Sequence, residues 1–397
     1  MTTVKIDNIS TLILCTASHM MSHIHLFVLP ALMPLFKNLY HLSYSEIALI
    51  LSVYFLLLAI STPISSVLAE RYSIKIMIVV GMILAGMALF LLSFVNTLQN
   101  KIIVSGILGA GSAIYHPCGT TLLSNLYDQS VRGKVMGIHG VGSNLGVIVA
   151  PIILGICIKF NAYKLAMYLF AAMSITIGIF DYFMLNNTVM SDGLKIKKKF
   201  VMLSMLKSKR NVFAYLAYGL RDATYCGLFI FVPLYLVNHY DYSAAFAASV
   251  LGILPIIGIG ANVVGGVLGD SIGRLETIII GLAVACGGFI CVVYGGVHVY
   301  LFFLVMIFIA IGLFATFPLF DAVVADITPI EFRTFQYGNI FSLGAVLGGI
   351  IALMGGVISD LISPNIAFSI LGIASFLCLL FIWLLKKEAS RLDHDIL

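Results

Sequence analysis

Charged side chains are scarce in this sequence. Asp, Glu, Lys and Arg make up 10% of its 397 residues, whereas soluble domains carry about 25%. Hydrophobic residues reach 61%, and the mean hydropathy is +1.10. An aqueous fold cannot hide so much apolar surface, because burial is limited by surface-to-volume scaling. The composition therefore excludes a soluble protein and predicts a chain whose solvent is lipid.

Paired cysteines and metal-ligand motifs are missing as well. The seven cysteines are scattered, without a Cys-x-x-Cys pair or a Cys/His spacing typical of zinc sites. We expect neither a disulfide framework nor a resident metal nor another cofactor. Paired catalytic acids and the zinc pattern His-Glu-x-x-His are also absent from the sequence. We therefore do not expect an enzyme.

Long apolar runs dominate what is present. A membrane-spanning helix needs roughly 20 apolar residues, and polar or Gly/Pro breaks mark the loops. This criterion predicts an all-α protein of the cell (inner or plasma) membrane with twelve spans, at 10–36, 46–69, 75–97, 101–125, 134–158, 162–186, 212–237, 244–268, 276–297, 299–325, 335–359 and 364–385.

Basic residues predict which side is cytoplasmic. With the N-terminus inside, the inner segments carry 17 of the 22 Lys and Arg residues and the outer loops carry four, while Arg221 lies within a span. Such an excess marks the cytoplasmic side, so both termini are expected there. The net charge of +5 is then a topology signal, and we expect no nucleic-acid partner.

The chain divides into two related halves. Residues 187–211 are the one long polar interruption and predict a basic cytoplasmic linker between six-helix halves at 1–186 and 212–397. A shift of 200–201 residues aligns the halves, and the matches include two charged pairs and a proline pair: Glu70 with Asp270, Arg132 with Arg333, and Pro117 with Pro318. Parallel repeats are typical of transporters that rock two halves about a midplane site.

The loop after the eighth span has a recognisable pattern, GGVLGDSIGR. Gly266 permits close helix approach, Gly273 permits a tight turn, and Asp270 lies at an inner helix end, where it can pair with a base and latch one conformation. The loop resembles the signature of the major facilitator superfamily, although Ser271 stands where that family usually has a base. This resemblance covers nearly the whole chain and implies a solute transporter.

The other motif stretches are less regular. The first-half loop, SVLAERYSIK, keeps the charges of Glu70 and Arg71 but neither glycine. The fifth span reads LGVIVAPIILG around Pro151 and resembles the fifth-helix motif of proton-coupled exporters, with ordinary small-residue packing as the alternative. A gating role is expected for Glu70, Arg71, Arg132, Pro151, Gly266, Asp270, Gly273, Arg274 and Arg333.

A narrower resemblance concerns the first, fourth and fifth spans. The run GAGSAIYHPCG, the Gly-rich fifth span and the SHMMSH stretch of the first span resemble the fosmidomycin resistance branch of the superfamily. The sequence departs from that branch at Cys118, where an acid is common. The resemblance implies efflux of small, often antimicrobial, molecules.

Ionisable residues inside spans are costly and are functional candidates by default. Arg221 and Asp222 lie about ten residues, roughly 15 Å, into the seventh span and so near the midplane. Arg can grip a carboxylate, phosphate or phosphonate with two hydrogen bonds, and protonation of Asp222 would free it to do so. A permanent structural ion pair is the alternative.

Other polar residues of the spans divide into two groups. His116 either satisfies the carbonyls freed by Pro117 or serves as a substrate donor or proton relay. Candidate hydrogen-bond partners of the solute are Tyr115, Asn144 and Tyr225. We expect packing or gating roles near the inner ends for His139, Asp181 and Asp321.

The stretch SHMMSHIH places three histidines in the first span. On a helix His19 and His23 differ by about 40° and share a face, whereas His25 lies about 160° from His23. One helix therefore cannot gather all three around a metal, and a metal on His19 and His23 would need ligands from elsewhere, with His116 a candidate. We expect His19 and His23 to line the pathway and His25 to be structural or in its outer half.

The function expected from these residues is secondary active transport by alternating access. The leading hypothesis is a monomeric, proton-coupled exporter of a small organic solute, with the proton gradient as energy source and the lipid bilayer as surroundings. Uptake or facilitated transport of an anionic metabolite is the alternative. Divalent-metal export, a transport-dead sensor and an intramembrane enzyme are weaker alternatives.

Overall fold

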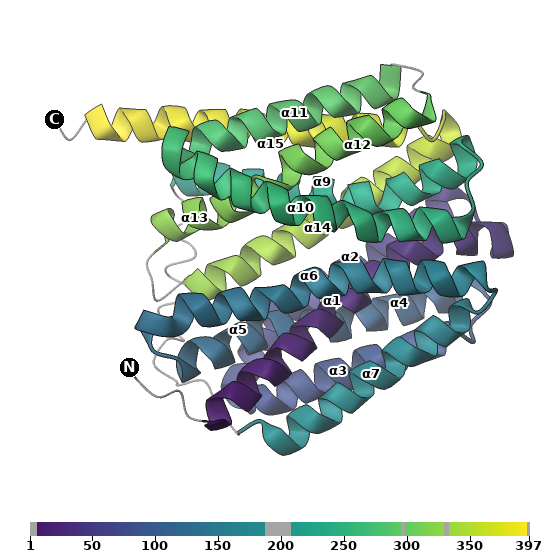
Figure 1. Ribbon diagram of the computed structural model, residues 1–397, viewed down its shortest axis with the longest axis horizontal. Coiled ribbons are helices and arrows are strands. Elements are labelled where there is room, and N and C mark those ends of the chain that lie inside the picture. Colours follow the sequence, from purple (N-terminus) through teal and green to yellow (C-terminus); the bar gives the residue numbers. More distant parts are fainter. Residues whose placement is uncertain (1–5, 187–207, 295–297, 329–332, 395–397) are drawn as a thin grey trace.

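The computed structural model describes residues 6–186, 208–294, 298–328 and 333–394, apart from some side chains near the ends of these ranges. Twelve stretches of helix within them are long and apolar enough to cross a membrane, which confirms the predicted number of spans. The helices (Figure 1) are α1 (Ile6–Tyr40), α2 (Tyr44–Arg71), α3 (Ile74–Leu92), α4 (Leu98–Ala113), α5 (Tyr115–Leu126), α6 (Gln129–Lys159), α7 (Tyr163–Met184), α9 (Lys209–His239), α10 (Ala244–Ile272), α11 (Arg274–Tyr294), α12 (Val299–Phe314), α13 (Phe317–Ile327), α14 (Arg333–Leu361) and α15 (Ile366–His394).

Two of the predicted spans are not single helices. The span predicted at 101–125 consists of α4 and α5, and the span predicted at 299–325 consists of α12 and α13. Proline has no N–H to donate to the carbonyl four residues earlier. The missing partner of Pro117 is Ala113, the last residue of α4, and that of Pro318 is Phe314, the last residue of α12. The fourth span of each half is therefore broken at the same place, just before the matched proline.

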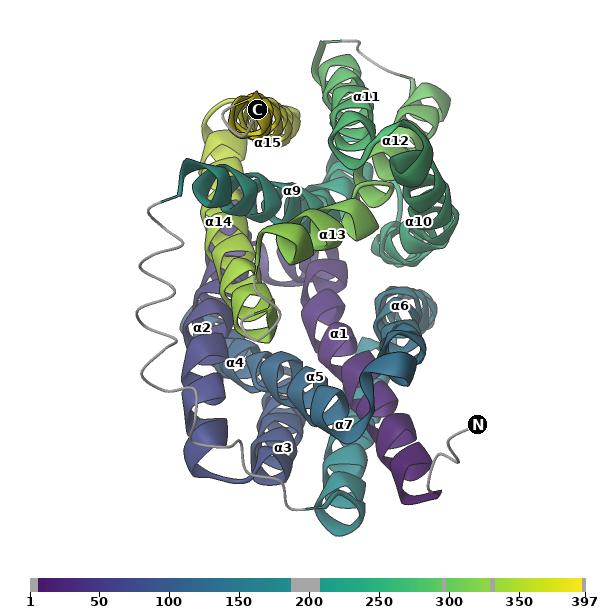
Figure 2. The ribbon, with the colours of Figure 1, turned by 90° about the vertical axis from the view of Figure 1, so that its left-hand side faces the viewer.

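The helices form two bundles that face each other across a central space. In Figure 1 the helices α1 to α7 occupy the lower part of the view and α9 to α15 the upper part. The start of α1 and the end of α15 lie at the same end of the molecule, which we call the terminal end. Figure 2 looks at the molecule from that end. Most of the linker predicted at 187–211 lies outside the described residues, and α9 already begins at Lys209.

The two bundles contact each other closely at the opposite end, which we call the far end. The Asp360 carboxylate of α14 accepts hydrogen bonds from the backbone N–H groups of Tyr44 and Ser45, at 2.9 and 2.8 Å, where α2 begins. The Ser45 hydroxyl donates a third bond to it at 2.5 Å. The negative carboxylate thus meets the positive end of the α2 dipole.

Glycines allow the second crossing between the bundles. A Cβ at Gly155 of α6 would meet the backbone of α10 at Ala245 and the Ser249 hydroxyl. A Cβ at Gly252 of α10 would in turn meet the Ile148 carbonyl oxygen of α6, 2.7 Å away. Pro151 lies inside this crossing, so the LGVIVAPIILG stretch joins the two bundles.

The terminal ends of the bundles are less closely packed. A Cβ added at Gly133, Gly137 or Gly140 of α6, or at Gly338 of α14, would meet no atom within 4 Å. The contacts that join the bundles at the far end have no counterpart at these four glycines.

Candidate functional site

A cavity of about 660 Å³ lies between the two bundles. Its walls come from α1, α2, α5 and α6 on one side and from α9, α13 and α14 on the other. It runs from Phe27 and Phe55 to Ser124 and Gly338, which lie nearer the terminal end. Towards the far end the rings of Phe27 and Phe229 meet with their centroids 4.7 Å apart. Cavities of this size hold small organic solutes.

Arg221 and Asp222 both line this cavity. The Arg221 Nη1 lies 3.2 Å from the Asp222 Oδ1, and the exposed fractions of the two side chains are 1% and 19%. The pair predicted near the midplane of the seventh span is therefore brought together at the wall of the central space. The buried member is the cation, whereas the carboxylate is open to the cavity.

The Arg221 guanidinium is held mainly by aromatic rings. Its Cζ lies 3.8 Å from the ring centroid of Phe317 and 4.4 Å from that of Tyr218, distances typical of cation–π contacts. Among the described residues, none of its three side-chain nitrogens has a hydrogen-bond partner of good geometry. A buried guanidinium with unused donors is costly, and an anion in the cavity would satisfy them.

Asp321 is a second carboxylate at this wall. It lines the cavity from α13, and its Oδ1 accepts a hydrogen bond of 2.7 Å from the Tyr218 hydroxyl. The Tyr337 hydroxyl donates to its backbone oxygen, also at 2.7 Å. The sequence predicted packing or gating for Asp321, whereas the structure places it in the cavity with Arg221 and Asp222.

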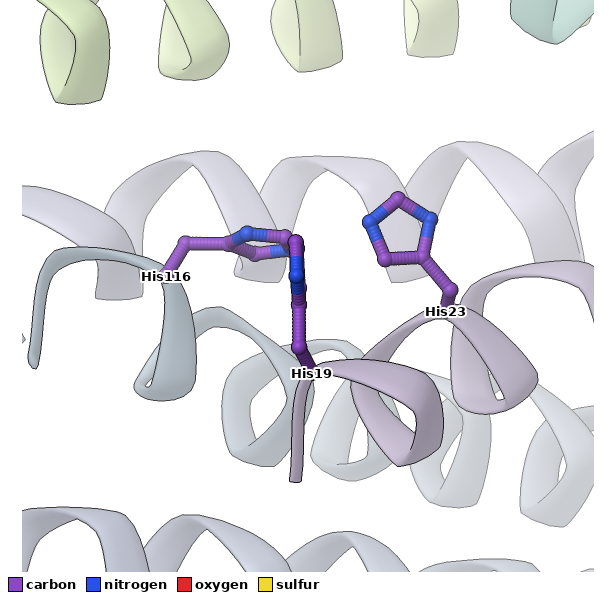
Figure 3. A group of neighbouring side chains, drawn as sticks. All are labelled: His19, His23 and His116. Carbon is purple, nitrogen blue, oxygen red and sulfur yellow. The ribbon is translucent and has the colours of Figure 1, made fainter. Parts of the chain in front are cut away.

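Three histidines form the opposite wall. The side chains of His19 and His23 from α1 and His116 from α5 point towards one another (Figure 3), and one potential ligand atom from each lies within 4.8 Å of the others. As predicted, His19 and His23 lie on the same face of α1, and their ring centroids are 5.0 Å apart. We refer to these three residues as the histidine triad.

A buried group behind the triad holds His19 in place. The His139 ring stacks on the His19 ring at a centroid distance of 4.1 Å, and the His139 backbone oxygen lies 3.0 Å from the His19 Nδ1. The His139 Nε2 is 2.8 Å from the Tyr115 hydroxyl, which also donates to the Cys15 backbone oxygen. Tyr115 is buried and does not line the cavity, but its ring contacts those of two lining residues, His19 and His116.

Close helix contacts at glycine position both walls. A Cβ at Gly146 of α6 would lie 2.8 Å from the His23 Cβ. In the second half a Cβ at Gly344 of α14 would lie 2.8 Å from the Asp222 Cβ. In each half, then, a glycine of the fifth span admits a cavity residue of the first span.

The remaining candidates lie in different surroundings. Tyr225 lines the cavity, whereas Asn144 is exposed and is not part of its lining. His25 is buried away from the lining, and neither ring nitrogen has a hydrogen-bond partner among the described residues. Asp181 is buried in α7, where its Oδ2 accepts a 2.7 Å hydrogen bond from Ser18.

The predicted gating residues are only partly brought together. Arg274 pairs with Asp326 of α13 rather than with Asp270, which is exposed. Gly273 has a φ of +106° and makes the expected tight turn, while Gly266 has open space around it. Arg132 donates to the Tyr127 backbone oxygen at 3.2 Å, and Arg71 is exposed. The side chains of Glu70 and Arg333 lie outside the described set.

The aromatic residues around Arg221 were not identified from the sequence. Phe317 immediately precedes Pro318, just as His116 precedes Pro117. Alignment of the two halves could therefore have placed Phe317 in the cavity, because His116 was already a candidate. No sequence signal distinguished Tyr218 or Asp360 from the many other tyrosines and loop acids.

The fold and the site together describe a membrane transporter built from two bundles of six spans each. A family model described as Major Facilitator Superfamily matches residues 14–338 and 261–395. The chain belongs to this superfamily, and it is an integral membrane protein that spans the bilayer many times.

Two relatives with named functions are distantly similar to this chain. The chain is 23% identical over 398 residues to the probable nitrate transporter NarT of Staphylococcus carnosus, covering 92% of this chain and 93% of that one. It is 22% identical over 260 residues to a probable hexose phosphate transport protein of Chlamydia trachomatis, covering 58% and 57%. The share of a relative's length that is matched varies from 24% to 93%. These matches do not confirm the narrower resemblance to the fosmidomycin resistance branch.

The fold is also similar to solved structures. The crystal structure of a bacterial homologue of the human lysosomal transporter Spinster, in an inward-facing and occupied conformation, matches with a TM-score of 0.78. The sequence identity is 14%, and the match covers 97% of this chain and 98% of that chain. This similarity supports the fold.

Proposed function

We propose that this chain is a proton-coupled transporter of a small anion, moved by alternating access through the central cavity. The observation that carries the proposal is the Arg221 guanidinium, which is 1% exposed, lines the cavity and has no hydrogen-bond partner of good geometry among the described residues. A bidentate anion such as a carboxylate, nitrate or phosphate ester matches its planar fork.

The charges around Arg221 link anion binding to protonation. One guanidinium faces two carboxylates, those of Asp222 and Asp321, so the ionised site disfavours a further negative charge. Protonation of Asp222 neutralises its carboxylate and breaks the ion pair with Arg221, so that the guanidinium can bind an anion. Because linkage is reciprocal, the anion then favours protonation to the same extent.

This linkage favours co-transport over exchange. A proton and an anion that bind the same state of the site together are carried in the same direction. With an inward proton gradient the result is uptake, which was the alternative hypothesis at the sequence level. The similarity to a probable nitrate transporter and to a probable hexose phosphate transport protein supports an anionic solute.

Orientation completes the proposal. We place both termini in the cytoplasm because of the distribution of basic residues. The close contacts at the far end then make this an inward-facing state, and the Spinster homologue with the similar fold was solved in a conformation of the same name.

Export by proton exchange is the second candidate. It rests on the LGVIVAPIILG stretch, which resembles an exporter motif and which lies where α6 crosses α10. The fosmidomycin-type resemblance supports the same reading. In exchange, the proton and the solute compete for the site rather than assist each other.

A proteoliposome experiment separates the two candidates. Nitrate, inorganic phosphate, a hexose phosphate and short carboxylates would be offered with a pH gradient imposed in either direction. Co-transport predicts accumulation inside vesicles when the outside is acidic, and exchange predicts accumulation when the inside is acidic. Equal uptake of the transported anion in the presence and absence of a gradient would reject proton coupling in either form.

Two substitutions test the assigned roles. Arg221→Gln should weaken anion binding at least about tenfold, since a charge-assisted contact is worth about 1.5–3 kcal/mol.

Asp222→Asn should keep binding measurable while abolishing accumulation driven by the gradient. Arg210→Gln, on the same helix outside the cavity lining, and Asp241→Asn, at a positive φ of 56° that Asn tolerates, are matched controls. Gradient-driven transport by Asp222→Asn at the rate of the unsubstituted protein would contradict the coupling role.

A further inference from the structure

We propose that the histidine triad binds one divalent transition metal ion of the Zn²⁺, Co²⁺ or Ni²⁺ class inside the cavity. This site is distinct from the Arg221–Asp222 wall and goes beyond the proposed anion transport. The sequence led us to expect no metal, because His19 and His23 alone supply only two ligands. Packing of α5 against α1 supplies the third from His116.

The ring positions fit a tetrahedral ion. Three imidazoles on zinc, each with a Zn–N distance of about 2.1 Å, place their ring centroids about 5.2 Å apart and their nitrogens about 3.4 Å apart. The centroid distances here are 5.0 Å for His19–His23, 5.4 Å for His19–His116 and 5.3 Å for His23–His116. The three rings are therefore at nearly the separations that a metal requires.

Only the orientation of the rings must adjust. The potential ligand atoms are separated by up to 4.8 Å, which exceeds the spacing expected around a bound ion. The second side-chain torsion of histidine, χ2, has a broad distribution, so the rings of His23 and His116 can turn a nitrogen towards the centre while His139 holds the His19 ring. No movement of α1 or α5 as a whole is needed.

The hydrogen bond behind His19 selects the tautomer that a metal needs. Ligating histidines usually donate their second N–H to a carbonyl or carboxylate, which fixes the ring. The His19 Nδ1 lies 3.0 Å from the His139 backbone oxygen, and this oxygen can only accept. The proton is therefore on Nδ1, which leaves the Nε2 lone pair free for a metal.

An unpartnered polar atom gives independent support. The His23 Nδ1 is buried and has no hydrogen-bond partner among the described residues. Leaving such an atom without a partner costs free energy, and a metal ion would remove that cost. All three histidines also line the cavity, so the ion has an entry path and its fourth position stays open for water or an anionic solute.

Cobalt is a suitable probe because its visible spectrum reports coordination. Full-length protein, purified in detergent without a polyhistidine tag, would be titrated with Co²⁺. We expect one ion per chain, intense visible bands of a tetrahedral site with nitrogen ligands, and loss of these bands when Zn²⁺ is added. The absence of such bands from the unsubstituted protein would overturn the proposal, as would a thiolate charge-transfer band that Cys226→Ser removes.

Substitutions assign the ligands. His19→Gln, His23→Gln and His116→Gln should each weaken Co²⁺ binding at least about tenfold, a loss of the size seen when a metal site is disturbed. His298→Gln, at an exposed histidine outside the cavity, should bind like the unsubstituted protein. Retention of the bands in all three triad variants would refute the assignment.

Two further measurements keep the proposal testable if the triad variants do not fold. X-ray absorption of the Zn²⁺-loaded unsubstituted protein should show three imidazole ligands, and a spectrum with two or fewer would overturn the site. Arg221→Gln should retain Co²⁺ binding, because its side chain belongs to the other wall. Failure of anion transport would therefore leave the metal result unaffected, and the reverse also holds.

Discussion

At the scale of single residues, the three histidines of α1 have different surroundings. His19 and His23 line the cavity, whereas His25 is buried away from it. We expect His19→Ala or His23→Ala to reduce the transport rate at least about tenfold, or about 1.4 kcal/mol in activation free energy, and His25→Ala to reduce it less. Transport per folded molecule in proteoliposomes is the measurement. The reverse order would contradict the assignment of the pathway face.

The same residues show which features of the site can be predicted from the sequence. Helical periodicity correctly placed His19 and His23 on one face. The distance of Arg221 from the start of its span pointed to the pathway, and its side chain lines the cavity. Periodicity describes one helix at a time. It could not show that His116 of α5 meets α1, or that Asp321 of α13 faces Arg221, because those contacts depend on how the helices pack.

At the scale of helices, glycine contacts decide where the cavity residues lie. A Cβ at Gly146 would lie 2.8 Å from the His23 Cβ and 3.2 Å from the Ile24 backbone nitrogen. Gly146→Ala should therefore force α6 and α1 apart and destabilise the protein by about 1–3 kcal/mol, the usual cost of overpacking. The transport rate should fall as well.

Gly140→Ala is the matched control for this substitution. Gly140 lies on the same helix, and a Cβ there would meet no atom within 4 Å, so its thermal stability should be unchanged or slightly higher because Ala favours helix. Thermal unfolding of both variants in detergent checks the prediction. Equal melting temperatures would show that the α1–α6 contact does not limit stability.

The interrupted spans show why a hydropathy pattern was insufficient at this scale. Both broken spans are apolar on average despite polar residues such as His116 and Asp321, so their mean hydropathy predicts one helix each. A single missing N–H at Pro117 or Pro318 changes the backbone without changing that average. The prolines were visible in the sequence and matched in the repeat, but whether the chain bends or breaks there depends on the neighbouring helices.

At the scale of the whole molecule, the far-end contact should control the balance between conformations. Asp360→Asn removes the charge and one acceptor from the contact with the start of α2. Since Asp360 is exposed to solvent, we expect a modest effect of about 1 kcal/mol, or about fivefold, in favour of opening at the far end. Spin labels on α2 and α14 would report the change as longer inter-bundle distances.

The control for this experiment is another carboxylate at the same end. Asp241→Asn changes a carboxylate in the turn between α9 and α10 and should leave the distance distribution unchanged. If both variants shift the distribution equally, general loss of negative charge rather than the α2–α14 contact is responsible.

The two walls of the cavity differ in chemistry, and this difference has a consequence for selectivity. The histidine triad belongs to the first bundle. The Arg221 guanidinium and the carboxylates of Asp222 and Asp321 belong to the second. A molecule that contacts only one wall gains no binding free energy when the two bundles move together. It therefore binds without promoting the change between conformations. We therefore expect a ligand that contacts a single bundle to bind without being carried, and the transported anion to be one that contacts both Arg221 and the histidine triad.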